Sequence, residues 1–190
     1  MKLIDVLRPP LRLFYKLFYK FKISGLENIP QKGGCIIASN HLAFHDPVII
    51  AAFIKDKYIS FLAKQELFKI KIIGVLLKSL GAIPINRGLR DAQTLINAVE
   101  HLKAGNTFCI FPEGTRIKNG IRIKGKKGTI RIARMADVPI IPVHLKGNYK
   151  FFSKIEMVIG KPVRYEINEK IQEIELTEKT EDLLNRIYDL

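Results

Sequence analysis

Residues 34–54, GCIIASNHLAFHDPVIIAAFI, contain an apolar run, a polar loop and a second apolar run. Residues 34–39 are short, uncharged and rich in apolar side chains, which is typical of a buried strand. Residues 47–54 begin with proline, which is favoured in the first turn of a helix, and Asp46 before it is the expected N-cap. The stretch therefore predicts a strand, a polar loop and a helix.

The same alternation continues along the chain. Further strands are predicted at residues 58–63, 82–85, 107–111, 140–145 and 155–159, and helices at residues 67–80, 89–103, 129–136 and 177–188. Strands that alternate with helices are typical of a parallel sheet covered on both faces. We therefore predict an α/β protein: a single domain with a mostly parallel central sheet flanked by helices, preceded by an amphipathic helical segment.

That segment lies at the N-terminus. Pro9 and Pro10 precede a predicted helix over residues 11–21, in which cations recur every four residues and aromatic side chains occupy the other side. Such a helix can lie in a bilayer interface. We predict a membrane-interface helix over residues 1–22 and one larger domain over residues 23–190. The residues expected to bind the membrane are Arg12, Phe14, Lys16, Phe18 and Lys20. Alternatively, the helix packs on its own domain with its cations in water.

Composition limits the class of protein. The chain has 190 residues, 47% of them hydrophobic, which excludes general disorder. Its net charge of +14 favours anionic partners such as phosphorylated substrates, anionic lipid or nucleic acid. Cys35 and Cys109 lie in apolar runs, so we expect reduced, buried thiols and a cytoplasmic setting. No apolar run is long enough to span a bilayer, so a membrane contact would be peripheral.

His41 and Asp46 follow the first predicted strand, and ligands of α/β sheets bind at the carboxyl ends of strands. If the chain turns between them, the carboxylate can orient the imidazole as a general base. No GxSxG motif accompanies the pair, which favours activation of a hydroxyl on the substrate. Alternatively, Asp46 only caps its helix. His41, His45 and Asp46 could also suggest a metal site, but no HExxH motif is present and we predict none.

Two arginines also follow predicted strands. Arg87 comes after residues 82–85, and Arg116 comes after residues 107–111. Two guanidinium groups at one edge of a sheet form a clamp that suits phosphate. Glu113 lies beside Arg116 and could orient a guanidinium group or bind a substrate hydroxyl.

Four blocks together resemble the glycerolipid acyltransferases, of the 1-acyl-sn-glycerol-3-phosphate (lysophosphatidic acid) acyltransferase type. Asn40, His41 and Asp46 match the NHx4D motif, and residues 111–116 (FPEGTR) match the third block. Residues 81–87 and 138–143 resemble the second and fourth blocks, in the family's order, within a similarity that spans residues 25–162. Ala43 departs from the family, which often has serine there.

The resemblance implies a reaction and its residues. His41, oriented by Asp46, would deprotonate the hydroxyl of 1-acyl-glycerol 3-phosphate, which attacks acyl-CoA or acyl-acyl-carrier protein to give phosphatidic acid. The residues assigned to substrate binding are Glu113, Arg116, Arg87, Gly114, Thr115 and Lys64. No cofactor and no nucleic acid are expected, and the enzyme would act at the cytoplasmic face of the cell membrane as a peripheral protein on an anionic surface.

Two alternatives stay open at this point. One keeps the chemistry and changes the acceptor to glycerol 3-phosphate or another lysolipid. The other is a non-catalytic basic protein that binds lipid or nucleic acid. This second alternative explains the net charge of +14 but not the two pairs, His41 with Asp46 and Glu113 with Arg116.

Overall fold

The structure is a computed structural model that describes residues 3–55, 57–79, 81–85, 92–117, 121–166 and 173–190. Its strands are β1 (Lys20–Ser24), β2 (Cys35–Ser39), β3 (Ile59–Lys64), β4 (Ala82–Ile85), β5 (Thr107–Ile110), β6 (Ile140–Lys146) and β7 (Lys154–Ile159). Its helices are α1 (Leu3–Phe18), α2 (Asp46–Phe53), α3 (Lys71–Ser79), α4 (Ala92–Lys103), α5 (Gly128–Ala136) and α6 (Glu173–Tyr188). Two short 3₁₀ turns are η1 (Leu26–Asn28) and η2 (Gln65–Lys69).

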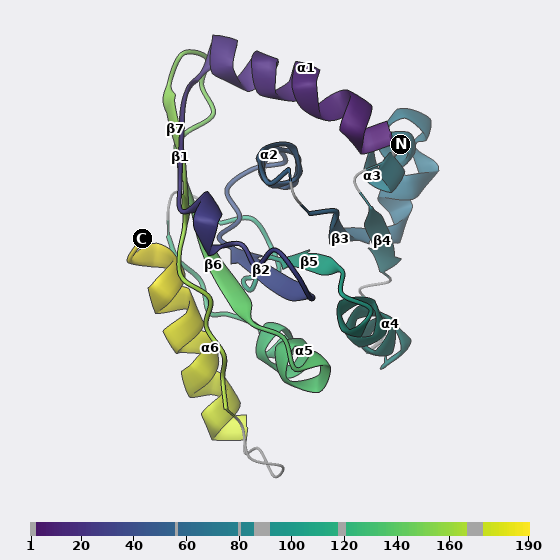
Figure 1. Ribbon diagram of the computed structural model, residues 1–190, viewed down its shortest axis with the longest axis vertical. Coiled ribbons are helices and arrows are strands. Elements are labelled where there is room, and N and C mark those ends of the chain that lie inside the picture. The colour runs from purple at the N-terminus through teal and green to yellow at the C-terminus, as the bar shows by residue number, and fades with distance from the viewer. Residues whose placement is uncertain (1–2, 56, 80, 86–91, 118–120, 167–172) are drawn as a thin grey trace.

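The described strands form one seven-stranded sheet in the order β1-β7-β6-β2-β5-β3-β4. The five strands from β6 to β4 are parallel to one another, whereas β7 pairs with β6 in the antiparallel direction and β1 runs parallel to β7. Helices cover both faces of this sheet (Figure 1). The predicted fold class is therefore confirmed.

The N-terminal helix differs from the prediction at both ends. It begins at Leu3 and ends at Phe18, with Pro9 and Pro10 inside it. Proline inside a helix removes a backbone hydrogen bond, but here buried Ile4 and Tyr15 anchor the helix to the domain on both sides of the prolines. Residues 20–24 are not helical, since they form β1 beside β7. The expected boundary between residues 22 and 23 therefore falls inside a strand of the sheet.

Two cations of α1 face the domain rather than solvent. Arg8 is 7% exposed, and its guanidinium group donates to the carbonyl oxygens of Ala51 (3.0 Å), Ile54 (3.4 Å), Lys55 (3.0 Å) and Lys57 (2.6 Å). Arg12 donates to the carbonyl oxygen of Ala52 at 2.6 Å. These carbonyl groups lie at and just after the C-terminal end of α2, which carries partial negative charge and lacks partners within the helix. The cations therefore fix α1 across the end of α2.

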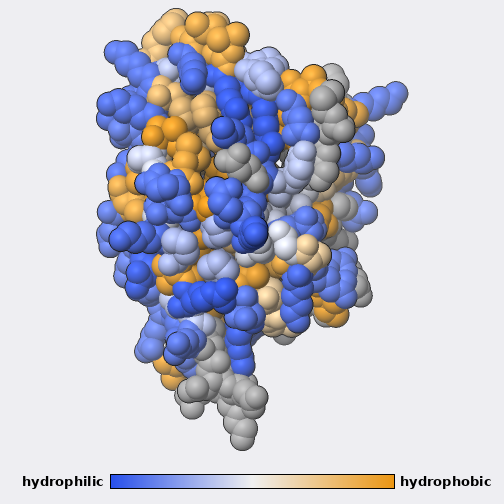
Figure 2. Space-filling model, in the orientation of Figure 1, coloured by the Kyte–Doolittle hydropathy of each residue, from blue (hydrophilic) through white to orange (hydrophobic). Residues whose placement is uncertain are grey.

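The opposite side of α1 is exposed and apolar. Figure 2 shows apolar surface at the top of the molecule, where α1 and the loop between β6 and β7 lie. The exposed large apolar residues here are Leu3, Val6, Leu13, Leu17, Phe18, Phe151 and Phe152.

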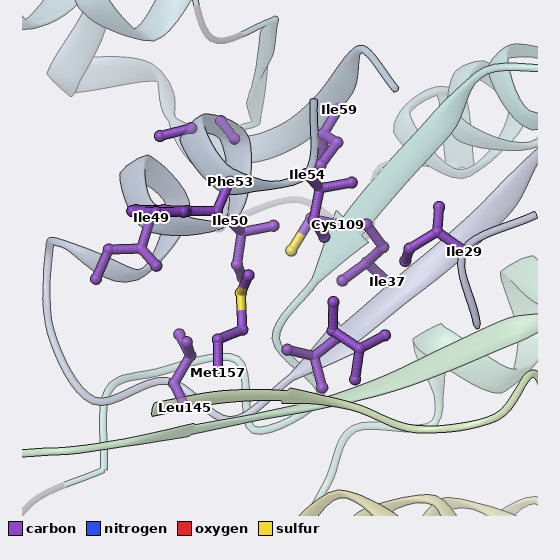
Figure 3. Packing of buried hydrophobic residues seen from close by; sticks show 14 of the residues in the cluster. Ile29, Ile37, Ile49, Ile50, Phe53, Ile54, Ile59, Cys109, Leu145 and Met157 are labelled. Carbon is purple, nitrogen blue, oxygen red and sulfur yellow. The ribbon is translucent and has the colours of Figure 1, made fainter. Parts of the chain in front are cut away.

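The core is divided by the sheet into two layers. Alternate residues of each strand point to opposite faces, so Cys35 and Ile37 of β2 pack toward α1 and α2, whereas Ile36 and Ala38 pack toward α4, α5 and α6. Figure 3 shows the first layer, with residues of α2 beside the sheet: Ile49, Ile50, Phe53, Ile37, Cys109, Leu145 and Met157. Because both faces are covered, β2 is buried along its whole length.

The remaining predicted elements are present with small differences. The helix expected over residues 67–80 is divided into η2 and α3, and the one expected over residues 177–188 begins at Glu173. Residues 86–91, which include Arg87 and the expected start of α4, lie outside the described part of the chain.

Candidate active site

The sheet order brings three loops to one edge. β2 lies between β6 and β5, and all three strands are parallel, so the segments that follow them leave the sheet at the same end. These segments carry His41 after β2, Glu113 and Arg116 after β5, and Tyr149 after β6. The topology therefore assembles one polar cluster from parts of the chain that are far apart in sequence.

Asp46 is the centre of that cluster. Its side chain is fully buried, and its Oδ2 lies 2.7 Å from Nδ1 of His41. The same oxygen accepts backbone N–H bonds from Leu42 at 2.6 Å and Ala43 at 2.8 Å. The chain thus turns tightly between His41 and Asp46, and the predicted pairing is present.

The expected N-cap role of Asp46 is wrong. His45 occupies the N-cap position of α2, and no side chain caps the helix there. The Asp46 carboxylate instead points back to the preceding loop. There it accepts hydrogen bonds from two backbone N–H groups and from the imidazole of His41. This geometry gives the carboxylate a role in the loop rather than at the helix end.

The pairing determines which nitrogen of His41 is available. A carboxylate can only accept hydrogen bonds, so Nδ1 of His41 carries the proton that is shared with Asp46. In the neutral ring, Nε2 therefore keeps its lone pair. The side chain is 18% exposed, and no group in the described part of the chain hydrogen-bonds to Nε2. His41 is thus set up to accept a proton from a bound hydroxyl group.

His41 is held from several directions. Its ring stacks on Phe111 with centroids 4.1 Å apart. Its backbone N–H donates to Oε2 of Glu113 at 3.1 Å, and its carbonyl oxygen accepts from the N–H of Ile117 at 2.8 Å. All three contacts come from the segment that follows β5, so that segment fixes the imidazole relative to the sheet.

Glu113, which the sequence assigns to substrate binding, is buried inside the protein. It is 2% exposed, and its Oε1 accepts a hydrogen bond from the hydroxyl of Tyr188 at 2.5 Å. Burial raises the pKa of its carboxyl group, and the bonds from Tyr188 and His41 oppose this shift. Both oxygens are engaged inside the protein, so the contact with a substrate stays a prediction, and it requires one of these bonds to be exchanged.

Arg116 is exposed at the same edge. Its guanidinium carbon lies 3.8 Å from the ring centroid of Phe44, which belongs to the loop between His41 and Asp46. Cation–π contact of this kind holds the charge beside the loop between His41 and Asp46 without satisfying the hydrogen-bond donors of the guanidinium group. The arginine therefore lies beside the His41–Asp46 loop, and its guanidinium donors have no hydrogen-bond partner among the described residues.

The other predicted binding residues are less defined. Gly114 adopts φ 69° in the turn after β5, a conformation that favours glycine, and Thr115 beside it is exposed. Lys64 is the last residue of β3, at the same edge of the sheet as the loop between His41 and Asp46. Arg87 lies outside the described residues, so its part in an anion clamp stays a prediction.

Asn40 has a structural part in this site. Its side-chain amide donates to the carbonyl oxygen of Leu145 at 2.9 Å, and its Oδ1 accepts from the N–H of Leu145 at 2.7 Å. The amide thus continues the pairing of β2 with β6 by one further step. This fixes the point at which the loop between His41 and Asp46 leaves the sheet.

Two tyrosines of the site were not predicted from the sequence. Tyr149 donates a hydrogen bond to Oδ1 of Asp46, and Tyr188 donates to Glu113. For Tyr149 a signal existed, because it follows a strand that leads to the same edge as β2. For Tyr188, near the end of α6, nothing in the local pattern indicates a site.

The two cysteines and His45 are further side chains that could carry chemistry. Cys35 and Cys109 are buried, and burial raises the pKa of both thiols, so neither is available as a nucleophile. Nδ1 of His45 lies 3.0 Å from the hydroxyl of Tyr15, and its ring stacks on Tyr149. Within the described ranges, no three histidine, cysteine or acidic side chains are placed to share a metal ion.

Comparison with known proteins identifies this arrangement. The family model described as Acyltransferase matches residues 20–146, which contain the His41–Asp46 pair and the segment after β5. The chain belongs to the acyltransferase family. It is therefore an O-acyltransferase, as the four sequence blocks predicted.

Individual members of the acyltransferase family are similar over most of the chain. A 1-acyl-sn-glycerol-3-phosphate acyltransferase of Borreliella burgdorferi is 33% identical over 171 residues, covering 88% of this chain and 68% of that protein. One of Bacillus subtilis is 31% identical over 147 residues, covering 75% and 73%. The crystal structure of the 1-acyl-sn-glycerophosphate acyltransferase PlsC of Thermotoga maritima matches with a TM-score of 0.76 and 27% identity, over 98% of this chain and 79% of that one.

Proposed function

We propose that this acyltransferase transfers an acyl chain from acyl-CoA or acyl-acyl-carrier protein to the free hydroxyl of 1-acyl-glycerol 3-phosphate, which gives phosphatidic acid. The single observation that carries the proposal is the 2.7 Å contact between Nδ1 of His41 and Oδ2 of the buried Asp46 at the carboxyl edge of the sheet. Relatives that share 31–33% of their residues with this chain carry the name of that activity.

The proposed step needs no covalent enzyme intermediate. Nε2 of His41 removes the proton from the acceptor hydroxyl as its oxygen forms a bond to the thioester carbonyl carbon. Asp46 stabilises the imidazolium that forms. When the carbon–sulfur bond breaks, the donor leaves as a thiolate and takes up the proton that His41 removed from the acceptor, which gives the free thiol. The buried state of Cys35 and Cys109 supports this direct route, because neither thiol can reach the donor.

The acceptor phosphate is assigned to Arg116. The guanidinium group lies over Phe44, in the loop between His41 and Asp46. Phosphate is a natural partner for its planar set of hydrogen-bond donors. A glycerol phosphate that places its phosphate on Arg116 would extend its hydroxyl toward His41. This arrangement favours an acceptor with both groups on one short backbone, as in 1-acyl-glycerol 3-phosphate.

The direct test is an assay of the purified protein with labelled acyl-CoA or acyl-acyl-carrier protein and a panel of acceptors. The panel contains 1-acyl-glycerol 3-phosphate, glycerol 3-phosphate and a lysolipid with a choline headgroup. We expect phosphatidic acid from the first acceptor as the main product. A main product from either of the others would overturn the proposed substrate, and hydrolysis of the donor in place of transfer would overturn the proposed reaction.

Replacement of Arg116 by alanine is expected to raise the apparent KM of the acceptor by about 10–100-fold, because a hydrogen bond to a charged group contributes about 1.5–3 kcal/mol. The KM of the donor should stay within about twofold. Steady-state kinetics with each substrate varied in turn measure both constants.

Arg164 provides the matched control for this prediction. It is an exposed arginine that is paired with Asp137 on the surface, so Arg164→Ala should leave both constants unchanged. A rise in the donor KM alone for Arg116→Ala would place that residue in the donor site.

We further propose that the exposed apolar side of α1 contacts the membrane that holds the acceptor. Leu3, Val6, Leu13 and Leu17 are 49–62% exposed and are separated by three, seven and four positions, which places them on one face of the helix. Phe18 continues this face toward Phe151 and Phe152, and rings of the three residues pack together. We name these seven residues the apolar ridge.

The apolar ridge differs from the surface expected from the sequence. Arg12 and Phe14 face the domain, where Arg12 bonds to α2 and Phe14 packs against the core. Lys16, Phe18 and Lys20 are exposed, so the two lysines stay candidates for contact with anionic headgroups and Phe18 for contact with the apolar part of the membrane. No helix in the described part of the chain is long and apolar enough to cross a bilayer. We therefore propose a peripheral contact, at the cytoplasmic face, where a thioester donor is available.

The double change of Leu13 and Leu17 to glutamate is expected to weaken binding to anionic lipid vesicles by about 10-fold or more, because each buried leucine contributes about 1.5–3 kcal/mol. The variant should keep its melting temperature, since both side chains are exposed. Vesicle sedimentation measures the binding. Point changes suit this test better than truncation, because α1 supplies Ile4 and Tyr15 to the core.

The control is Ile174→Glu, which changes a 67%-exposed apolar residue on α6. It adds the same type of charge away from the apolar ridge, so vesicle binding should stay near that of the unchanged protein. Equal losses for the two variants would show that net charge, rather than the ridge, decides binding.

A further inference from the structure

Asp46 has two oxygens with different surroundings. Oδ2 accepts hydrogen bonds from Nδ1 of His41 and from the backbone N–H groups of Leu42 and Ala43. Among the described residues, Oδ1 receives only the hydroxyl of Tyr149. Each oxygen of a fully buried carboxylate needs a hydrogen-bond donor, because an oxygen without one loses the free energy of its hydration and gains nothing in return.

Tyr149 reaches Asp46 from the loop between β6 and β7, and its backbone has an unusual conformation. Its φ is 55°, in the left-handed region that side chains other than glycine adopt at a cost of about 1–3 kcal/mol. Such a conformation persists where surrounding contacts determine it, and it is found most often at functional sites. The turn directs the phenol inward, onto the carboxylate.

The ring of Tyr149 is also fixed. It stacks on the imidazole of His45 with centroids 5.3 Å apart and an interplanar angle of 24°. Nδ1 of His45 in turn lies 3.0 Å from the hydroxyl of Tyr15, a buried residue of α1. The phenol is therefore held by one contact along its face and one at its hydroxyl, and the first of these is supported from α1.

We propose that Tyr149 is a positioning residue for acyl transfer: its hydroxyl fixes the rotation of the Asp46 carboxylate and thereby the orientation of the His41 imidazole. This inference rests on the proposed function of His41 as the general base. Tyr149 does not touch the reacting atoms, because Asp46 and His41 lie between its hydroxyl and Nε2.

The protonation of Tyr149 agrees with this role. Burial raises the pKa of its hydroxyl, and the nearby charge of Asp46 raises it further. The phenol therefore stays protonated and remains a donor at ordinary pH. The hydrogen bond from Tyr149 to Oδ1 fixes the rotation of the carboxylate. The lone pairs of Oδ2 are then directed toward Nδ1 of His41.

The test is Tyr149→Phe, which keeps the ring on His45 and removes only the hydroxyl. We expect kcat to fall about 10–100-fold, with both KM values within about twofold, because the lost bond to a charged group acts on the base and not on substrate binding. A second readout does not depend on activity. The Nδ1–H of His41 should give a downfield proton NMR resonance that is absent in His41→Ala, and it should move or broaden in Tyr149→Phe.

Tyr165 supplies the matched control, because its hydroxyl donates to the carboxylate of Asp182 at 2.8 Å, away from the site. Tyr165→Phe removes the same kind of bond and should change neither kcat nor the His41 resonance. An unchanged resonance in folded Tyr149→Phe would overturn the proposal, even if kcat fell with the melting temperature. If the unchanged enzyme transferred no acyl group, the proposed function would fail, while the resonance would still report whether Tyr149 orients the pair.

Discussion

Replacement of His41 by alanine is expected to lower kcat for acyl transfer by about 10²–10⁴-fold, the usual loss when a general base is removed. The structure gives the reason: Nδ1 is bound to Asp46, which leaves Nε2 as the atom that can take the proton. The fold should persist, because the imidazole is partly exposed and its main packing contact is the face of Phe111. Steady-state kinetics at saturating concentrations of both substrates measure kcat for the variant and for the unchanged enzyme.

The control is another histidine in a polar contact. His101 of α4 lies 2.8 Å from the hydroxyl of Ser60, at the start of β3 and so at the opposite edge of the sheet. His101→Gln should keep kcat close to that of the unchanged enzyme. Near-normal turnover by well-folded His41→Ala would contradict the mechanism and would require another base.

The parallel part of the sheet could be predicted from the sequence because its strands are short apolar runs between helices. β2 is an example, since residues that are buried on both faces must all be apolar or small. β1 was not predicted because it is an edge strand with exposed lysines, KFKIS, and among the described strands it pairs with β7 alone. Its alternating pattern is short and directly follows α1, so the local sequence does not show where the helix ends and the strand begins.

The orientation of α1 could not be predicted for a different reason. The helix carries apolar side chains on more than one face, and a sequence pattern alone does not show which face meets the domain. Tyr15 is buried against α2, while Leu13 and Leu17 are exposed. In the structure the guanidinium group of Arg8 binds carbonyl groups at and after the end of α2, 43–49 positions further along the chain, and a local sequence pattern does not display such contacts.

The candidate site shows the same limit. His41 and Asp46 are five positions apart and carry a recognisable spacing, so their pairing could be predicted. The two tyrosines that complete the site lie 103 positions from Asp46 and 75 positions from Glu113. Contacts across such distances are determined by the sheet order and by the path of each loop, and the sequence does not display either of them locally.

Exchange of Asp46 for asparagine separates the charge of the carboxylate from its hydrogen bonds. The amide oxygen can take the position of Oδ2 and accept from His41, Leu42 and Ala43, while the NH2 group faces Tyr149, whose hydroxyl can accept as well as donate. The geometry is thus largely kept, but the negative charge that stabilises the imidazolium is lost. We expect kcat to fall by about 10²–10⁴-fold, with both KM values little changed.

The comparison with two further variants decides the interpretation. Asp46→Ala leaves buried N–H groups without partners, at about 1–3 kcal/mol each, so it should lower the melting temperature much more than Asp46→Asn does. Asp182→Asn removes a surface carboxylate that binds Tyr165 and Arg186, and it should leave kcat unchanged. If Asp46→Asn retained most of its activity, the charge would not be needed, and Asp46 would act only by holding the loop. If the loss of kcat in Asp46→Asn instead matched that of His41→Ala, and a variant with both changes lost no more, the two side chains would act as one unit.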